Sequence, residues 1–123
     1  MAYIQTVTIP ATTAADGSAT AYSAVVQGLV EMVKVTLGTW SSGAVDITLT
    51  DELTGAPIVT LTNATDGLTV RPRGATHDVA GAAYLYAAGG VAVADKIAVN
   101  GRIKMVIAQG GNALTGSVTI QLS

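Results

Sequence analysis

Three consecutive runs of alternating apolar and polar residues fill the last part of the chain, from Lys96 to Leu122. Asn100-Gly101 separates the first two runs, and this dipeptide favours a two-residue type I′ turn because both residues tolerate a positive φ. A glycine-rich segment, residues 109–116, separates the second run from the third. Each run has one apolar and one polar face, as strands covering a core do. The pattern therefore predicts three consecutive antiparallel strands.

The rest of the chain shows the same alternation in shorter runs. Pro10 is expected to end the first of them, because proline cannot donate to a ladder. Residues 21–27 fit either a strand or a helical turn, and Asp16-Gly17 is expected to form a turn. The runs predicted as strands are Ile4–Ile9, Gly28–Leu37, a hairpin of Val45–Thr50 with Ile58–Thr62, and Leu68–Val70.

A long segment rich in Ala and Gly, residues 73–94, interrupts this series and contains one conceivable helical turn at residues 80–88. Long loops in small domains tend to carry function or contacts with partners. Short strands with a turn about every ten residues are typical of sandwiches and barrels. We therefore expect one all-β domain over residues 1–123, an antiparallel β-sandwich or partly open barrel with this one long loop.

The composition narrows the class of protein. The chain has 123 residues and no cysteine, so it has no disulfide and no thiolate metal site. Half of its residues are hydrophobic and only 11% are charged, which suits a surface that neighbouring subunits cover. A net charge of −2 and six scattered Lys and Arg residues argue against nucleic-acid binding. The start of the chain resembles no secretory signal, and no apolar run reaches the roughly 18 residues of a membrane span, which predicts a protein made in the cytoplasm without a membrane partner.

The candidates for catalysis are weak. His77 beside Asp78 has the chemistry of a general base or a metal ligand, but the chain offers no second His or Cys to complete a metal site. We expect His77 to bond locally or to contact another chain. The only adjacent carboxylates, Asp51-Glu52, fall in a predicted turn, where acids are normally solvated. We therefore expect no enzyme, no catalytic residue, no metal and no cofactor.

Arg71-Pro72-Arg73 contains two closely spaced arginines. Such a pair is either a recognition element at a subunit interface or a solvated strand end. Tyr84 and Tyr86 favour the interface, since Tyr and Arg are both enriched at protein–protein interfaces.

Several stretches of the chain resemble a family of small virion proteins of tailed bacteriophages. The resemblance covers most of the sequence, and its motifs are structural, with no enzymatic signature among them. The stretches that carry it are Tyr3–Val7, Thr13–Ala19, Thr69–Asp78, Ala80–Gly90 and Arg102–Gly111.

The resemblance to capsid decoration, or cement, proteins implies a structural protein on the outer surface of a phage capsid, in the virion. Its implied partners are the major capsid protein and further copies of itself, as a homotrimer. Residues 1–20 are a candidate N-terminal arm, with residues 2–10 adding a strand to a neighbour's sheet edge. The expected interface residues are Tyr3, Ile4 and Val7 in this arm, with Arg71, Arg73, His77, Tyr84 and Tyr86.

Two other functions fit the same sequence. The first is a head-completion or tail-associated structural protein, which differs from a decoration protein by its low copy number per particle. The second is a carbohydrate-binding adhesion module, which needs an exposed aromatic ring for stacking on sugars. Trp40, in a Gly- and Ser-rich turn, is the one residue that fits this role.

Overall fold

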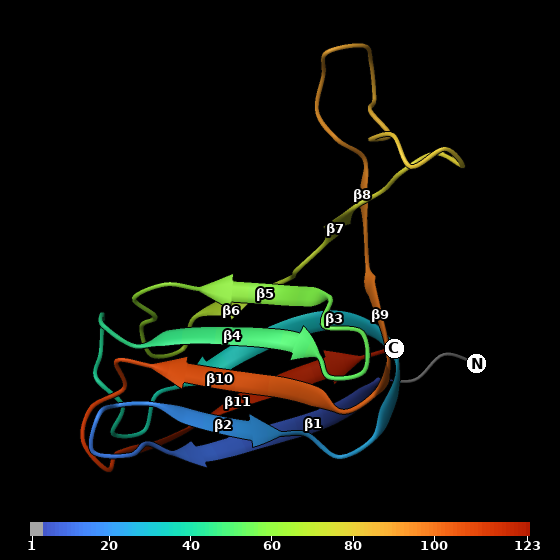
Figure 1. The fold of residues 1–123 in the computed structure, drawn as a ribbon. Coiled ribbons are helices and arrows are strands. Elements are labelled where there is room, and N and C mark those ends of the chain that lie inside the picture. The colour runs from blue at the N-terminus through green and yellow to red at the C-terminus, as the bar shows by residue number, and fades with distance from the viewer. Residues whose placement is uncertain (1–3) are drawn as a thin grey trace.

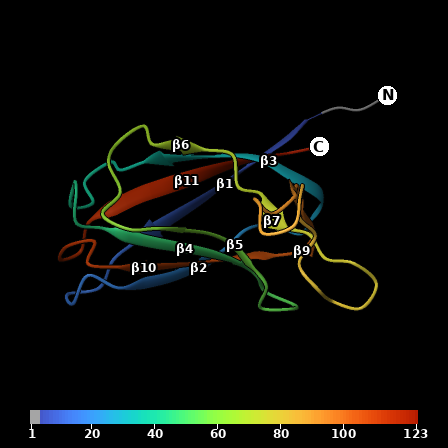
Figure 2. The same ribbon diagram turned by 90° about the horizontal axis from the view of Figure 1, so that it is seen from above.

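Two antiparallel sheets pack face to face in the part of the chain that the computed structural model describes, residues 4–123 (Figures 1 and 2). One sheet has the order β1 (Gln5–Thr12), β11 (Thr115–Leu122), β3 (Val26–Thr36), β6 (Thr69–Val70), with β9 (Ile97–Gly101) paired to the first half of β3. The other has the order β2 (Ala19–Tyr22), β10 (Ile103–Ala108), β4 (Asp46–Asp51), β5 (Pro57–Leu61). A pair of short strands, β7 (Gly74–Ala75) and β8 (Ala94–Asp95), stands apart from both. The predicted all-β antiparallel fold is confirmed, and residues 4–123 contain no helix.

The core lies between the two sheets and takes alternate residues from every long strand. Because successive side chains of a strand point to opposite faces, each strand sends one set inward and leaves the other outside. Burial of these aliphatic side chains supplies the main favourable term for folding, about 25 cal/mol per Å² of apolar surface. The fully buried residues include Ile47 and Leu49 of β4, Met105 and Ile107 of β10, Val33 and Val35 of β3, and Val118 and Ile120 of β11.

The predicted pairing at the end of the chain is wrong, although the strands themselves are present. β9 pairs with β3, β10 pairs with β2 and β4, and β11 pairs with β1 and β3. Asn100-Gly101 is therefore not a hairpin turn: Gly101, at φ 138°, lies where the chain passes from one sheet to the other. The crossing places Val99 and Ile103 in the shared core, whereas a hairpin would have kept both strands in one sheet.

The N-terminal segment also differs from expectation. β1 runs through Pro10, which pairs with Ser117, so Pro10 does not end the strand. β1 is an edge strand, where the N–H that proline lacks is not needed by a further neighbour. Residues 5–12 pair with β11 of their own chain along their whole length, with Ile9 buried. They are a strand of the sandwich and not a free arm.

Several other predictions from the sequence can be compared with the structure. The hairpin of β4 and β5 is confirmed, and so is the turn at Asp16-Gly17, where Asp16 Oδ1 accepts hydrogen bonds from the amide and hydroxyl of Ser18. Residues 19–22 form strand β2, which decides between strand and helical turn for most of that segment. The helical turn conceived for residues 80–88 does not form.

Trp40 closes one end of the core. Its ring packs against Gly116, where an added Cβ would lie 2.4 Å from Trp40 Cδ2 and 2.5 Å from the carbonyl oxygen of Leu37. At position 116 of β11, only glycine leaves room for this ring. The sequence suggested an exposed Trp40 for sugar stacking, but the side chain is buried, so this premise of the carbohydrate-binding alternative is wrong.

We predict that Gly116→Ala lowers the free energy of unfolding by about 1–3 kcal/mol, because the methyl group overpacks the contact with Trp40. Gly74→Ala is the matched control. Gly74 also lies in a strand without a positive φ, and its Cβ would meet only Ile97 at 3.5 Å. Urea unfolding followed by tryptophan fluorescence measures both variants. Equal stability of the two variants would contradict the steric account.

Candidate functional site

A forked projection stands outside the sandwich where the sequence predicts the long loop (Figure 1). We call residues 74–95 the fork. Its stem is the pairing of β7 with β8, extended by a hydrogen bond from Thr76 N to Val93 O at 2.8 Å. Above this bond the chain forms two small loops. The first prong, residues 77–83, is closed by a bridge between His77 and Ala83, and the second prong, residues 85–92, by a bridge between Leu85 and Ala92.

Tyr84 lies at the junction of the stem and the prongs. Its amide donates to the carbonyl of Thr76 at 3.0 Å, and its carbonyl accepts from the amide of Val93 at 2.8 Å. Its backbone therefore ties the two prongs to the stem. This bonding gives the long segment a defined shape, although it contains few regular strand residues.

The first prong is built around Asp78. Its Oδ1 accepts the amides of Ala80 at 2.9 Å and Ala82 at 3.0 Å, and Gly81 adopts φ 84° at the turn. The carboxylate that follows His77 in sequence thus shapes a turn. His77 is exposed beside it, and among residues 4–123 no group of acidic side chains gathers around it to hold a metal ion.

The second prong has a tip of small residues. The amide of Tyr86 donates to Val91 O at 3.0 Å, and the amide of Gly90 donates to Ala87 O at 2.8 Å. Gly89, at φ 70°, makes this tight reversal accessible. The side chain of Tyr86 is 76% exposed and that of Val91 75% exposed.

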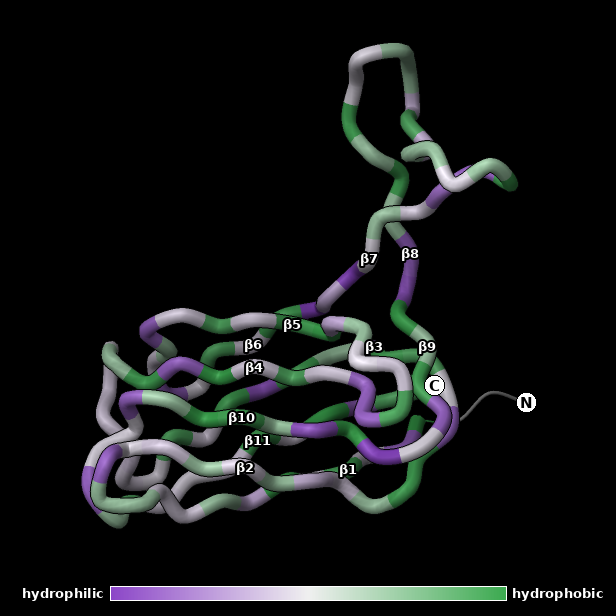
Figure 3. Tube along the Cα trace, viewed as in Figure 1, coloured by the Kyte–Doolittle hydropathy of each residue, from purple (hydrophilic) through white to green (hydrophobic). Residues whose placement is uncertain are grey.

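The fork is apolar although it is exposed. The segment from Val79 to Ala94 contains only Ala, Gly, Val, Leu and Tyr, with no charged residue. Val79, at the first prong, is fully exposed, and Tyr84 is 55% exposed. Figure 3 shows that apolar and neutral residues dominate the prongs, whereas hydrophilic ones gather near the stem. A two-stranded projection of this kind has little stability of its own in water, and exposed apolar patches usually mark interaction sites.

The base of the fork is fastened to the sandwich. Arg73 Nη1 donates to the carbonyls of Pro72 at 2.8 Å and Val30 at 3.4 Å, and Pro72 is buried. Lys96 forms an ion pair with Glu31 on β3. Glu31 Oε1 also accepts the hydroxyl of Ser123 at 2.8 Å. Arg73 therefore ties the base of the fork to β3, although Arg73 and Arg71 are both exposed.

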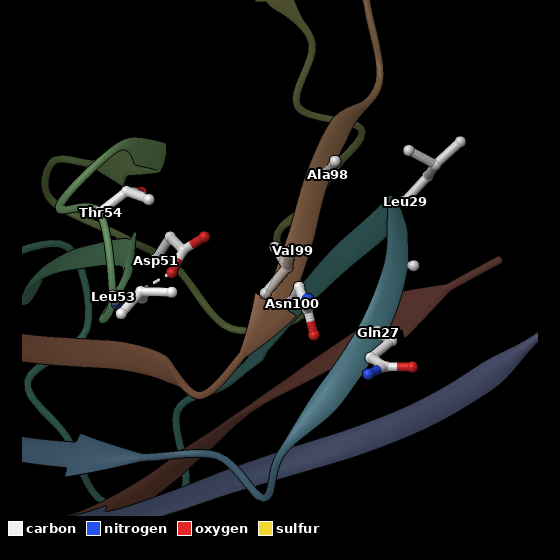
Figure 4. A pocket seen from close by; sticks show the side chains of 9 residues that line it. Gln27, Leu29, Asp51, Leu53, Thr54, Ala98, Val99 and Asn100 are labelled. Carbon is white, nitrogen blue, oxygen red and sulfur yellow. Dashed lines mark hydrogen bonds between the residues drawn. The ribbon is translucent and has the colours of Figure 1, made fainter.

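A shallow apolar groove of about 510 Å³ lies beneath the fork, between β3, β9 and the turn that joins β4 to β5 (Figure 4). Leu53, 80% exposed, and Leu29 contribute much of its apolar lining. Its one carboxylate, Asp51, is nearly buried and accepts the amide of Leu53 at 3.0 Å. The side chains and backbone that line the groove come from Gln27, Gly28, Leu29, Asp51, Leu53, Thr54, Ala98, Val99 and Asn100.

The predicted interface residues fall into two separate groups. His77, Tyr84 and Tyr86 come together in the fork, with Arg71 and Arg73 at its base. Ile4 and the half-buried Val7 lie at β1, on the opposite edge of the sheet, with β11 and β3 in between. Tyr3 is outside the described residues. The sequence reading missed Val79 and Val91, which the uncharged run from Val79 to Ala94 would have indicated, and it missed Leu29 and Leu53 of the groove.

The other polar candidates have structural partners. Glu52 pairs with Arg102, whose Nε donates to Glu52 Oε1 at 2.8 Å and whose guanidinium lies 4.3 Å from the ring centre of Tyr22. This hydrogen bond to Glu52 raises the pKa of Arg102. Within residues 4–123, no group of His, Asp and Glu side chains is arranged to hold a metal ion. The same residues include no helix long and apolar enough to cross a membrane.

The chain matches no protein-family model, and neither curated proteins nor solved structures include a significant match to it. The site is therefore interpreted from its own geometry and from the sequence.

Glu31 links the fork to the pH dependence of stability. The hydrogen bond from Lys96, then that from Ser123, lowers the pKa of Glu31. A carboxyl whose pKa is lower in the folded state stabilises the fold above its unfolded pKa, about 4.3, and loses this contribution as the pH falls through the folded value. We predict that Glu31→Gln is less stable than the parent at pH 7 and that the difference disappears in strong acid.

Chemical denaturation at a series of pH values measures this difference. In a Lys96→Met background the effect of Glu31→Gln should be smaller, because the largest cause of the pKa shift has gone. A stability difference that stays constant from neutral pH to strong acid would contradict the role assigned to Glu31.

Proposed function

We propose that this protein is a non-enzymatic structural protein of a tailed-bacteriophage virion, which binds the outer surface of the capsid and stabilises it. Its proposed partners are the major capsid protein and other copies of itself, as a homotrimer. The fork is the observation that carries the proposal. From Val79 to Ala94 it presents an exposed, uncharged, apolar surface of defined shape, which is what a surface covered by other protein subunits requires.

The residue types of the fork suit tight contact between subunits. Ala and Gly lose little or no side-chain entropy on burial, and Tyr supplies a large contact area with few rotatable bonds. Such a surface gains contact area at a small entropic cost. The sequence stretches that resemble phage virion proteins, residues 69–78 and 80–90, form the base of the fork and most of its two prongs.

Binding alone is enough for the proposed activity. A protein that binds the assembled shell and not its free subunits shifts the equilibrium toward the shell by mass action. Many weak contacts repeated over a lattice then add up to a large stabilisation. No reaction is needed, which fits a sandwich whose polar side chains are engaged in turns and ion pairs.

The test removes the prongs and keeps the sandwich. Replacing residues 77–92 by Asn-Gly joins Thr76 to Val93, which already form a hydrogen-bonded pair, through a two-residue turn. We expect the parent protein to co-sediment with capsids assembled without it, in many copies per particle, and to raise their heat resistance. The shortened variant should bind at least about 100-fold more weakly, as loss of a central apolar contact implies.

Asp16→Asn is the matched control, because Asp16 is exposed in the turn between β1 and β2, and Figure 1 shows this turn at the other end of the sandwich from the fork. It should bind as the parent does. Circular dichroism and the unfolding midpoint check that the shortened variant keeps its sandwich. Capsid binding that survives removal of both prongs would overturn the proposed role of the fork. A low copy number at one vertex would overturn decoration in favour of a head-completion protein.

A further inference from the structure

We infer that the second prong of one copy docks into the groove of a second copy, so that fork and groove form an interface between copies of this chain. The inference deepens the proposed function, on which it rests, by naming the partner of the second prong. It comes from two unpartnered apolar surfaces on the same molecule whose chemistry matches.

The first match is between the apolar side chains. The second prong, residues 85–92, consists of Leu, Tyr, Val, Ala and Gly, and Tyr86 and Val91 are its large exposed residues. The exposed apolar residues that line the groove are Leu53, Ala98 and, at its edge, Leu29, whereas Val99 is nearly buried. A tyrosine buries about 150–250 Å² when it is covered, and tyrosines in closely fitted pockets are frequent binding hot spots. A groove of about 510 Å³ has room for this side chain.

Polar groups at the groove fit the same anchor. A buried tyrosine hydroxyl needs a hydrogen-bond partner, and Gln27, Thr54 and Asn100 line the groove with side chains that donate and accept. Figure 4 shows Gln27 and Asn100 on neighbouring strands at one side of the groove, and Thr54 across it. An apolar floor with a few polar groups is typical of a site that holds one aromatic anchor.

Charge distinguishes the two prongs. The first prong contains Asp78, and the groove contains the carboxylate of Asp51, so entry of the first prong would bring two carboxylates toward each other. Like charges brought close together disfavour binding, although solvent in a shallow groove reduces this cost. The second prong has no charged residue and meets no such penalty. Charge therefore favours the second prong over the first as the occupant of the groove.

The arrangement of the fork favours a neighbouring molecule. The fork is continuous with β9, whose residues 98–100 line the groove, and the stem carries the prongs away from that groove (Figure 1). In a closed assembly each copy then gives one prong and receives one. The contact joins the eight residues of the second prong (residues 85–92) to the nine residues that line the groove. This is fewer than the roughly 20–30 residues on each side of a standard stable interface, so we expect each single contact to be weak and a closed assembly to add several of them.

A lipid surface is a poorer occupant for the second prong. Its tip is irregular backbone around Gly89 and Gly90, and irregular backbone exposed to lipid leaves peptide groups without hydrogen-bond partners. A protein groove with amide and hydroxyl side chains satisfies such groups. Flotation with vesicles of phosphatidylglycerol and phosphatidylcholine tests the alternative directly, and binding that depends on Tyr86 would overturn the inference.

Disulfide trapping tests the contact itself. The parent chain has no cysteine, so each introduced thiol is unique. We expect Ala87→Cys, at an exposed position next to the anchor Tyr86, mixed with differently tagged Leu53→Cys under mild oxidation, to form a covalent heterodimer. Because each copy carries one thiol, a disulfide between the two tags joins different molecules.

Thr65→Cys replaces Leu53→Cys in the matched control, because Thr65 is exposed in the connection that follows β5, at the other end of the sandwich from the β4–β5 turn (Figure 1). This mixture should give little heterodimer. Equal trapping at residues 53 and 65 would overturn the inference.

Affinity between copies gives an independent measurement. Sedimentation equilibrium should show self-association of the parent. The dissociation constant should be about 30-fold higher in Tyr86→Ser, the size of effect expected for a hot-spot residue. Val79→Ser, on the first prong, should change the dissociation constant less than about twofold, as residues outside a hot spot do. A strictly monomeric parent, or equal effects of the two substitutions, would overturn the inference.

These measurements use the protein without capsids, so they separate the two proposals. Capsid binding without trapping at residue 53 would refute the prong–groove contact and leave the proposed function standing. Trapping without capsid binding would support the prong–groove contact and refute the proposed function.

Discussion

Burial of two aliphatic strand faces against each other is the constraint on which the rest of this structure depends. The chain has no phenylalanine, and its core relies on Val, Ile and Leu side chains that are fully enclosed between the sheets. Such side chains fill a thin, flat core well because β-branched residues pack closely on a pleated surface. β3 is central to this arrangement, since it pairs with β11 on one side and with both β6 and β9 on the other.

The fork depends on β3 in turn. Arg73 donates to a carbonyl of β3, and Lys96 pairs with Glu31 on the same strand, so both legs of the fork are tied to the most fully paired strand of the molecule. The projection is thus held firmly at its base while its prongs remain uncovered. Because both legs of the fork are held, a partner has less of the chain to order on binding.

The sequence predicted the positions of the strands well, but it did not predict which strands pair with each other. Period-two alternation reports which face of a strand is buried, so the runs around Ile47, Met105 and Ile120 were identifiable from the sequence alone. It does not report which edge a strand joins, and Asn100-Gly101, a strong hairpin signal, occurs where the chain changes sheets. For the same reason, the sequence indicated the fork but not the groove. Tyr84 and Tyr86 stand in one unusual stretch, whereas Leu29 and Leu53 come from segments of different sheets and line one groove only after the sheets have packed.

The stem has a consequence for how this molecule changes over generations. The sandwich is complete below the hydrogen bond between Thr76 and Val93, so the residues beyond it contribute little to folding. Substitutions, insertions and deletions in the prongs therefore escape most of the purifying pressure that a core imposes. A lineage can rewrite this surface as its partner drifts, while the scaffold that displays it stays the same.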